Sequence, residues 1–299
     1  MLDRESTFAH PEIVKLLRTE FVPIAIDQAY QRRQKDTEGN YYRKIAAQGP
    51  RDLNGTTQGF YVASASGKLL LYNNNRDPEK VLRLMKQSAT EFRRLPSSDR
   101  QATGLRDQQV DRRYSPAPPK GGLVIRVRAR ILDGYEPTDN KWRRIFQTAT
   151  SRDNLWLTAE EHKSLAAGTV PDLVARRLAR YHLVDNTRGE PPMWKDSEIK
   201  SIDLKISDGT INGNVHLRTA SGDREYKADL HGWIESKGGR VTRLDLVARG
   251  NFRGEGPYTR GAPRGWFPLA VTFRLADGKD TADAIPPQGS RGWIQGYLR

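Results

Sequence analysis

The chain has 299 residues, with 50 lysines and arginines against 36 aspartates and glutamates, and so carries a formal net charge of +14. It contains no cysteine, which excludes a disulfide scaffold, a zinc ribbon, an iron–sulfur site and thiol catalysis. No run of about 18 apolar residues occurs, which excludes a membrane-spanning helix, and the length suggests two domains.

The first residues are charged and no apolar stretch follows them. The sequence therefore predicts no secretory signal peptide in the chain as given. We expect a cytoplasmic protein from this chain, or an exported one if the true start lies upstream and carries a signal.

The first part of the chain, residues 1–95, alternates predicted helices and strands. Apolar residues at helical spacing predict helices, and alternating apolar residues predict strands. Pro11 and Pro78 each suit the first turn of a helix, where the missing N–H is no loss. The expected elements are a helix over 10–20, a strand over 21–27, a helix over 28–48, strands over 59–64 and 69–72, and a helix from 78 to about 94.

Four segments of this first part carry a pattern: ESTFAHPEIV at 5–14, FVPIAID at 21–27, QGFYV at 58–62 and SGK at 66–68. Together with the order of the elements, they resemble the thioredoxin superfamily over about residues 1–95. The nearest resemblance is to the thioredoxin-like domains of the spermatogenesis-associated group. It implies a thioredoxin-like α/β domain.

The chain differs from that family in the segments that contain the family's redox-active residues. Members have a β-strand and a Cys-x-x-Cys motif before the segment that matches 5–14, and a cis-proline before the strand that matches 59–64. Here the chain begins at Met1, and residues 55–59 contain no proline. Thiol–disulfide exchange needs a thiolate, so we expect a redox-inactive domain that does not reduce insulin. Two interpretations stay open: a redox-inactive descendant, or a start that lies downstream of the true one.

Residues 96–121 are predicted to be a linker because they are polar and punctuated by proline and glycine. All six tryptophans follow this linker. The composition therefore changes there, and residues 122–299 are expected to form a separate domain.

This second part is predicted to be β-rich, and no family resemblance is apparent in it. Thr158 and Glu161 form a plausible capping box at the start of a helix. Several antiparallel strands with two inserted helices predict a β-sandwich or an open barrel, which makes the whole chain α+β. The expected elements are strands over 123–132, 199–206, 212–219, 224–234, 240–250 and 269–276, and helices over 158–167 and 171–183.

The densest polar and aromatic stretch runs from residue 182 to residue 194. A hydrolytic site is one interpretation: His182 would act as a base, Asp185 would orient it, and Glu190 or Arg188 would hold the substrate. The other interpretation is a structured crossover loop with a packed tryptophan and a paired arginine, which the rarity of catalytic loops favours. Further ligand-binding candidates in this stretch are Asn186, Arg188 and Trp194.

A second candidate is the glycine- and arginine-rich stretch over 254–268. Its glycines do not have the spacing of a nucleotide-binding fingerprint. Glu255, Arg260 and Arg264 would bind an anion or a sugar, with Trp266 as a stacking face. The alternative is a long loop between strands whose tryptophan belongs to the core.

The positive charge also raises nucleic-acid binding as a hypothesis. Arg126, Arg128 and Arg130 alternate along one predicted strand and would project from one face. However, no nucleic-acid-binding module is present in the sequence.

Three hypotheses result, in order of preference. The first is a redox-inactive thioredoxin-like module fused to a β-rich domain that binds a protein or an anionic or saccharide ligand. The second is a hydrolytic enzyme that uses His182, Asp185 and Glu190, and the third is a basic nucleic-acid-binding protein. No cofactor and no metal site are predicted.

Overall fold

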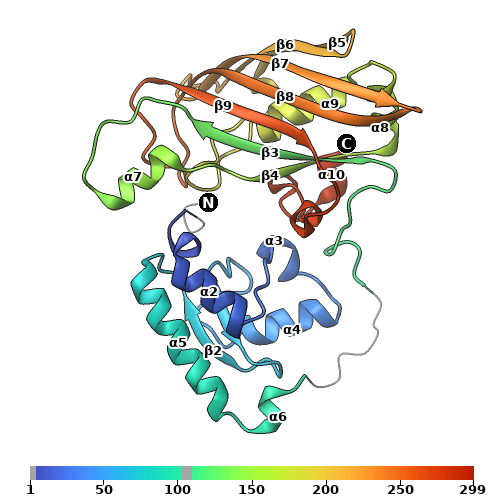
Figure 1. Ribbon diagram of the computed structural model, residues 1–299. Coiled ribbons are helices and arrows are strands. Elements are labelled where there is room, and N and C mark those ends of the chain that lie inside the picture. The colour runs from blue at the N-terminus through green and yellow to red at the C-terminus, as the bar shows by residue number, and fades with distance from the viewer. Residues whose placement is uncertain (1–4, 103–109) are drawn as a thin grey trace. The chain divides into compact units, whose positions relative to one another are not determined.

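The computed structural model describes residues 5–102 and 110–299 (Figure 1). The described residues divide into two compact units: residues 5–116 with Arg291–Trp293, and Ala117–Ser290 with Ile294–Arg299. The division after Pro116 lies inside the stretch predicted as a linker, which also contains the short helix α6 (Ser97–Arg100). Residues 103–109 of that stretch lie outside the described residues.

The first unit is built on a β-hairpin, β1 (Phe60–Ala63) with β2 (Leu69–Asn73), whose strands pair antiparallel. The long helices α2 (Pro11–Glu20) and α5 (Pro78–Arg94) pack together through a small core of Ile13, Leu16, Val81 and Met85, against which Phe60 of the hairpin also packs. Both helices have proline in the first turn, as predicted.

The predicted helix over 28–48 is instead two helices, α3 (Gln28–Gln31) and α4 (Thr37–Ala46). The break has a local cause. The side chain of Asp36 accepts a hydrogen bond from the backbone N–H of Gly39 and caps α4. Gly39 is required there, because a Cβ at this position would lie 2.1 Å from the carbonyl oxygen of Gln34.

The predicted strand over 21–27 does not form, and this expectation is wrong. Residues 21–27 join α2 to α3 without pairing with another strand, since the sheet of this unit has β1 and β2 only among the described residues. Val22 is 86% exposed and Ile24 is 70% exposed. Alternating apolar residues make a strand stable only when a neighbouring strand satisfies the backbone and a packed layer covers the side chains.

The second unit is organised around one large, curled antiparallel sheet, in which the described strands have the order β4-β3-β9-β8-β7-β6-β5 (Figure 1). The sheet is single and open, so the predicted sandwich of two packed sheets is not formed by the described residues. The strands are β3 (Leu123–Ile131), β4 (Asp153–Leu157), β5 (Ile199–Ser207), β6 (Thr210–Arg218), β7 (Glu225–Lys237), β8 (Arg240–Arg253) and β9 (Trp266–Leu275).

Five of these strands form a meander from β5 to β9, in which each strand pairs with the one that follows it in the sequence. Strand β3 then pairs with β9, and β4 pairs with the other edge of β3. The alternation of buried and exposed residues along β7 and β9 shows that one face of the sheet covers the core and the other is open.

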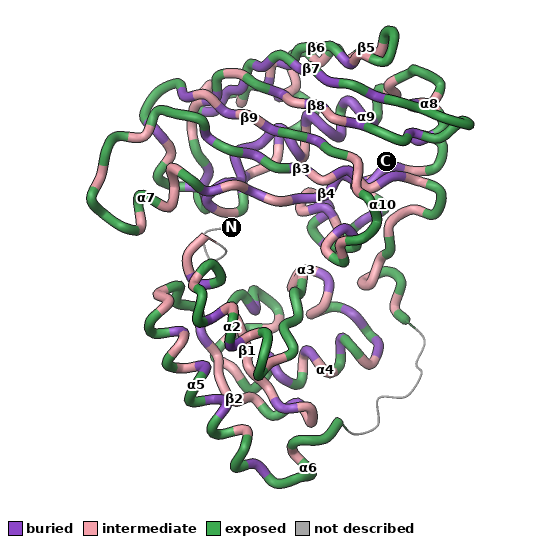
Figure 2. The backbone as a smooth tube through the Cα atoms, in the orientation of Figure 1, coloured by how far each residue is buried: buried purple, intermediate pink, exposed green. Residues whose placement is uncertain are grey.

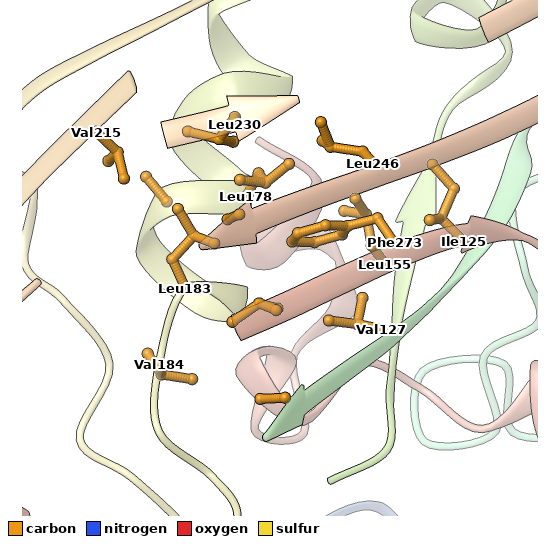
Figure 3. Packing of buried hydrophobic residues seen from close by; sticks show 14 of the residues in the cluster. Ile125, Val127, Leu155, Leu178, Leu183, Val184, Val215, Leu230, Leu246 and Phe273 are labelled. Carbon is orange, nitrogen blue, oxygen red and sulfur yellow. The ribbon is translucent and has the colours of Figure 1, made fainter. Parts of the chain in front are cut away.

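The inner face of the sheet is covered by α8 (Ala159–Ala166), by α9 (Asp172–Arg177) and by the π-helical turn Leu178–His182 that continues α9. Figure 2 shows the buried residues gathered between these elements and the strands. In Figure 3, Leu178 and Leu183 lie beside Leu230, Leu246 and Phe273 of the strands, which belong to the same core.

The capping box predicted at Thr158 is present: the Thr158 hydroxyl accepts from the N–H of Glu161, and the Glu161 carboxylate accepts from the N–H of Thr158. Three elements have no counterpart among the predicted ones: β4, α7 (Lys141–Thr148) and α10 (Ile294–Leu298).

Candidate functional site

His182, the predicted catalytic base, is a buried structural residue. Its Nε2 lies 2.6 Å from the hydroxyl of Tyr297, and its Nδ1 lies 3.1 Å from Oδ2 of Asp153. Burial raises the pKa of Tyr297 well above its ordinary value, and the charge of Asp153 raises it further. The phenol therefore stays protonated, whereas Nδ1 of His182 and Oδ2 of Asp153 lie close together without a hydrogen bond between them.

Asp185 does not orient His182, so that expectation is wrong. One oxygen of Asp185 accepts from the backbone N–H of Thr187 at 3.2 Å and from its hydroxyl at 2.7 Å. The other oxygen pairs with Arg188, and both partners are buried. The carboxylate is already committed to a local turn and an internal ion pair.

Arg188 joins the two stretches that the sequence singled out. Its Nε donates to the carbonyl of Thr259 at 3.1 Å, and its Nη1 donates to the hydroxyl of Tyr135 at 2.8 Å. The stretches 182–194 and 254–268 therefore meet, but through a buried arginine that ties loops together rather than through an open site.

The remaining candidates of the first stretch are divided between the interior and the surface. Trp194 is buried, donates to the carbonyl of Leu183 at 2.8 Å, and has the guanidinium of Arg224 4.0 Å from its ring centroid. Asn186 is also buried and donates to the side chain of Gln288 at 3.3 Å. Glu190 is exposed. The stretch therefore has the character of the packed crossover loop that the sequence left as the alternative.

The candidates of the second stretch lie on the surface. Glu255 accepts from the backbone N–H groups of Gly261 and Ala262, at 2.8 and 3.1 Å, and so closes its own loop. Arg260 and Arg264 are exposed. Trp266 is 46% exposed at the start of β9 rather than in the core, so its expected role as an accessible aromatic surface is compatible with its position.

The open outer face of the sheet contains a set of polar residues that the sequence did not single out. The registers place side chains of neighbouring strands opposite one another on this face: Asn214 on β6 opposes Asp229 on β7, which in turn opposes Arg249 on β8. Two residues along the same strands, Lys227 on β7 opposes Asn251 on β8.

A shallow, open hollow of about 330 Å³ lies over these three strands. Its polar lining consists of Asn214, His216, Lys227, Asp229, Arg249 and Asn251. In the described part of the chain, the side chains of Asn214, Asp229, Arg249 and Asn251 have no hydrogen bond or ion pair, so their polar groups are available to a ligand.

A buried carboxylate holds the margin of this hollow in place. Glu225 binds His216 at 2.8 Å and Lys227 at 3.4 Å, and it also pairs with Arg253 at 2.6 Å. Burial alone would raise the pKa of Glu225, but the hydrogen bonds from these three side chains and the charge of Arg253 outweigh it and lower the pKa to about 2. Glu225 therefore stays ionised and orders the positive groups around it.

Arginines extend the positive charge from the hollow across β9 to β3. Arg130 and Arg249 both oppose Ala270, one from each side, and Arg128 projects two residues before Arg130 on the same face. Arg128, Arg130 and Arg249 make no side-chain ion pair among the described residues. Arg126, by contrast, pairs with Asp283 at 2.8 Å and with Asp277, so it is not free to bind a ligand and the expected three-arginine row is reduced to two.

One signal in the sequence indicates this face, although it does not locate the hollow. Polar residues recur at every second position of β6, β7 and β8, which identifies the solvent side of each strand. The residues that oppose one another depend on the strand registers, and these are fixed by turns and bulges across the whole meander.

Comparisons of the chain with protein-family models, curated proteins and solved structures give no match. Among the described residues, no helix has both the length and the apolar character needed to cross a membrane. Residues 5–102 and 110–299 contain no group of three or more histidine, aspartate or glutamate side chains placed to hold a metal ion.

Proposed function

We propose that this chain is a binding protein, and that residues 117–299 bind an anionic ligand on the outer face of the seven-stranded sheet. The observation that carries the proposal is the hollow over β6, β7 and β8 together with the arginines beside it. Arg249 lines the hollow, and Arg128 and Arg130 lie across β9 from it, without acidic partners in the described structure.

The spacing of these arginines suits an extended anion. Neighbouring strands lie about 4.8 Å apart, so Arg130 and Arg249, separated by one strand, have Cα atoms roughly 10 Å apart. The small residue Ala270 between them leaves room for a ligand that contacts both. The net charge of +14 would draw an anion toward the protein before contact.

The hydrolytic alternative has less support from the geometry. The side chain of His182 is wholly buried and engaged with Asp153 and Tyr297, so a substrate does not reach it in this conformation. The nucleic-acid alternative shares the arginine-rich face with the present proposal, and polyphosphate represents the phosphate chain of such a ligand in the test below.

For the first unit, we propose a thioredoxin-like module without redox activity. What supports it is the set of sequence segments that resemble that superfamily, together with the β1–β2 hairpin followed by α5; the strand expected over 21–27 is missing from the order. The absence of cysteine from the chain leaves no thiolate for disulfide exchange.

The binding proposal is tested with two labelled anionic probes, oligogalacturonate and polyphosphate, by fluorescence anisotropy at low and moderate salt. The triple variant Arg128→Ala, Arg130→Ala and Arg249→Ala should lose about tenfold in affinity, because three exposed charge contacts at roughly 0.5 kcal/mol each add to about 1.5 kcal/mol.

The matched control removes three exposed cations from α5: Arg83→Ala, Lys86→Ala and Arg94→Ala. This control makes the same change in net charge. The accompanying loss of long-range attraction should lower the affinity for the probes by no more than about twofold. Equal losses in the two triple variants would show that net charge alone attracts the probes, and would overturn the proposed face.

A further inference from the structure

The hollow over β6, β7 and β8 is lined by both short and long polar side chains. Asn214, Asp229 and Asn251 are short, whereas Lys227 and Arg249 are long. The registers place the short side chains of Asn214 and Asp229 side by side, with Arg249 beyond Asp229 on β8. A recess of about 330 Å³ accommodates a ring-sized group.

Asp229 and Arg249 are the most informative pair in the hollow. They stand directly opposite each other on β7 and β8, where Cβ atoms lie about 4.5–5.5 Å apart and opposite charges usually attract. Nevertheless, no ion pair joins them in the described structure. Both residues are exposed and their side chains have no hydrogen bond or ion pair among the described residues, so a ligand has both groups at its disposal.

The kinds of polar group in the hollow discriminate between anionic ligands. Asp229 only accepts hydrogen bonds, Lys227 and Arg249 only donate, and Asn214 and Asn251 do both. A phosphate chain offers acceptors alone and would be repelled by Asp229 at the centre. A sugar hydroxyl both donates and accepts, so a row of hydroxyls satisfies the acidic and the amide side chains together.

From these groups we propose that the ligand is an acidic saccharide, which deepens the proposed function and rests on it. Ring hydroxyls bind Asn214, Asp229 and Asn251, and a carboxylate or sulfate of the same chain binds Arg249 or Lys227. Glu225 holds Lys227 at the margin, at 3.4 Å.

An exposed aromatic residue lies next to the hollow. Trp266 stands on β9 opposite Arg253, whose guanidinium is 4.8 Å from its ring centroid. Two residues along the same strand, Pro268 opposes Asn251 of the hollow. Aromatic rings bury the apolar faces of ligands while polar groups fix their orientation, so Trp266 supplies a surface for the next ring of a saccharide chain.

The test compares the same two probes, oligogalacturonate and polyphosphate, matched for the number of negative charges, on the full chain. The variants are Asp229→Asn and the double variant Asn214→Ala with Asn251→Ala. Each should weaken oligogalacturonate binding about fivefold or more, the equivalent of one ordinary hydrogen bond. Polyphosphate binding should stay unchanged in the amide variant and strengthen in Asp229→Asn, because a repulsive charge is removed.

The control is Glu235→Gln on β7, which removes an exposed carboxylate that lies six residues along the strand from Asp229, where it pairs with Arg243. This control variant should not change the affinity for one probe relative to the other. If Asp229→Asn changes the binding of both probes in the same direction, the saccharide inference is overturned while anion binding stands. If the wild-type chain binds neither probe at low salt, the proposed function fails as well.

Discussion

The replacement of His182 by alanine distinguishes a structural histidine from a catalytic one. The side chain is wholly buried, and the change removes its contacts with Tyr297 and Asp153. The vacated volume should cost about 2 kcal/mol, and the Tyr297 hydroxyl, left without its partner in the interior, about 1–3 kcal/mol more. Asp153 keeps the two hydrogen bonds that its Oδ1 accepts from the N–H groups of Asn154 and Gln288, both at 2.8 Å, whereas its buried Oδ2 loses the contact with His182 and adds to the cost.

The expected loss for His182→Ala is therefore about 3–5 kcal/mol. For a unit of this size, each kcal/mol lowers Tm by about 2–4 °C, which predicts a fall of roughly 10 °C in a thermal melt followed by circular dichroism. The control is His231→Ala on the exposed face of β7, which should change stability by less than about 0.5 kcal/mol. A His182→Ala variant that melts within about 2 °C of the wild type would refute the structural role.

Two further predictions concern stability. Glu225→Gln should destabilise the chain at neutral pH. Because the native pKa of Glu225 is lowered from 4.5 to about 2, the stabilising contribution of its carboxylate is present above about pH 4.5 and is lost as the pH falls toward 2. The free energies of unfolding of wild type and variant, measured by urea titration, should therefore converge in acid, and a constant difference from pH 7 to 2 would contradict the assignment. The double variant Val22→Thr with Ile24→Thr should cost less than about 0.5 kcal/mol in urea unfolding, because both side chains are largely exposed; a loss above 2 kcal/mol would show that they are packed.

The meander was predictable because its information is local. Strands β5 to β9 alternate apolar and polar residues and are separated by glycine-containing turns, such as the one at Asp208 and Gly209. The capping box at Thr158 was predictable for the same reason, since its two partners lie three residues apart.

The elements that escaped prediction depend on distant partners. All five residues of β4 are buried, including Asp153 and Asn154, because Asp153 faces His182 and Asn154 donates to the carbonyls of Ala282 and Ile285. Polar residues in a buried strand break the alternation that identifies strands in a sequence. In the opposite sense, residues 21–27 alternate well but have no strand beside them.

The candidate site was misplaced for a related reason. Proximity in the sequence suggested that Asp185 serves His182, whereas the chain brings Asp153 and Tyr297 to it from far away. The hollow could not be located from the sequence, because Asn214, Asp229 and Arg249 become neighbours only through two strand registers.

The pairing of β3 with β9 also has a consequence for synthesis. A chain emerges from the ribosome N-terminus first, so β3 and β4 are complete long before residues 266–275 exist to pair with them. During that interval β3 presents an unpaired apolar edge, the kind of segment that associates with other chains. Arg126, Arg128 and Arg130 place a charge at every second position of it, and charges placed in this way disfavour the pairing of an exposed strand edge with other chains.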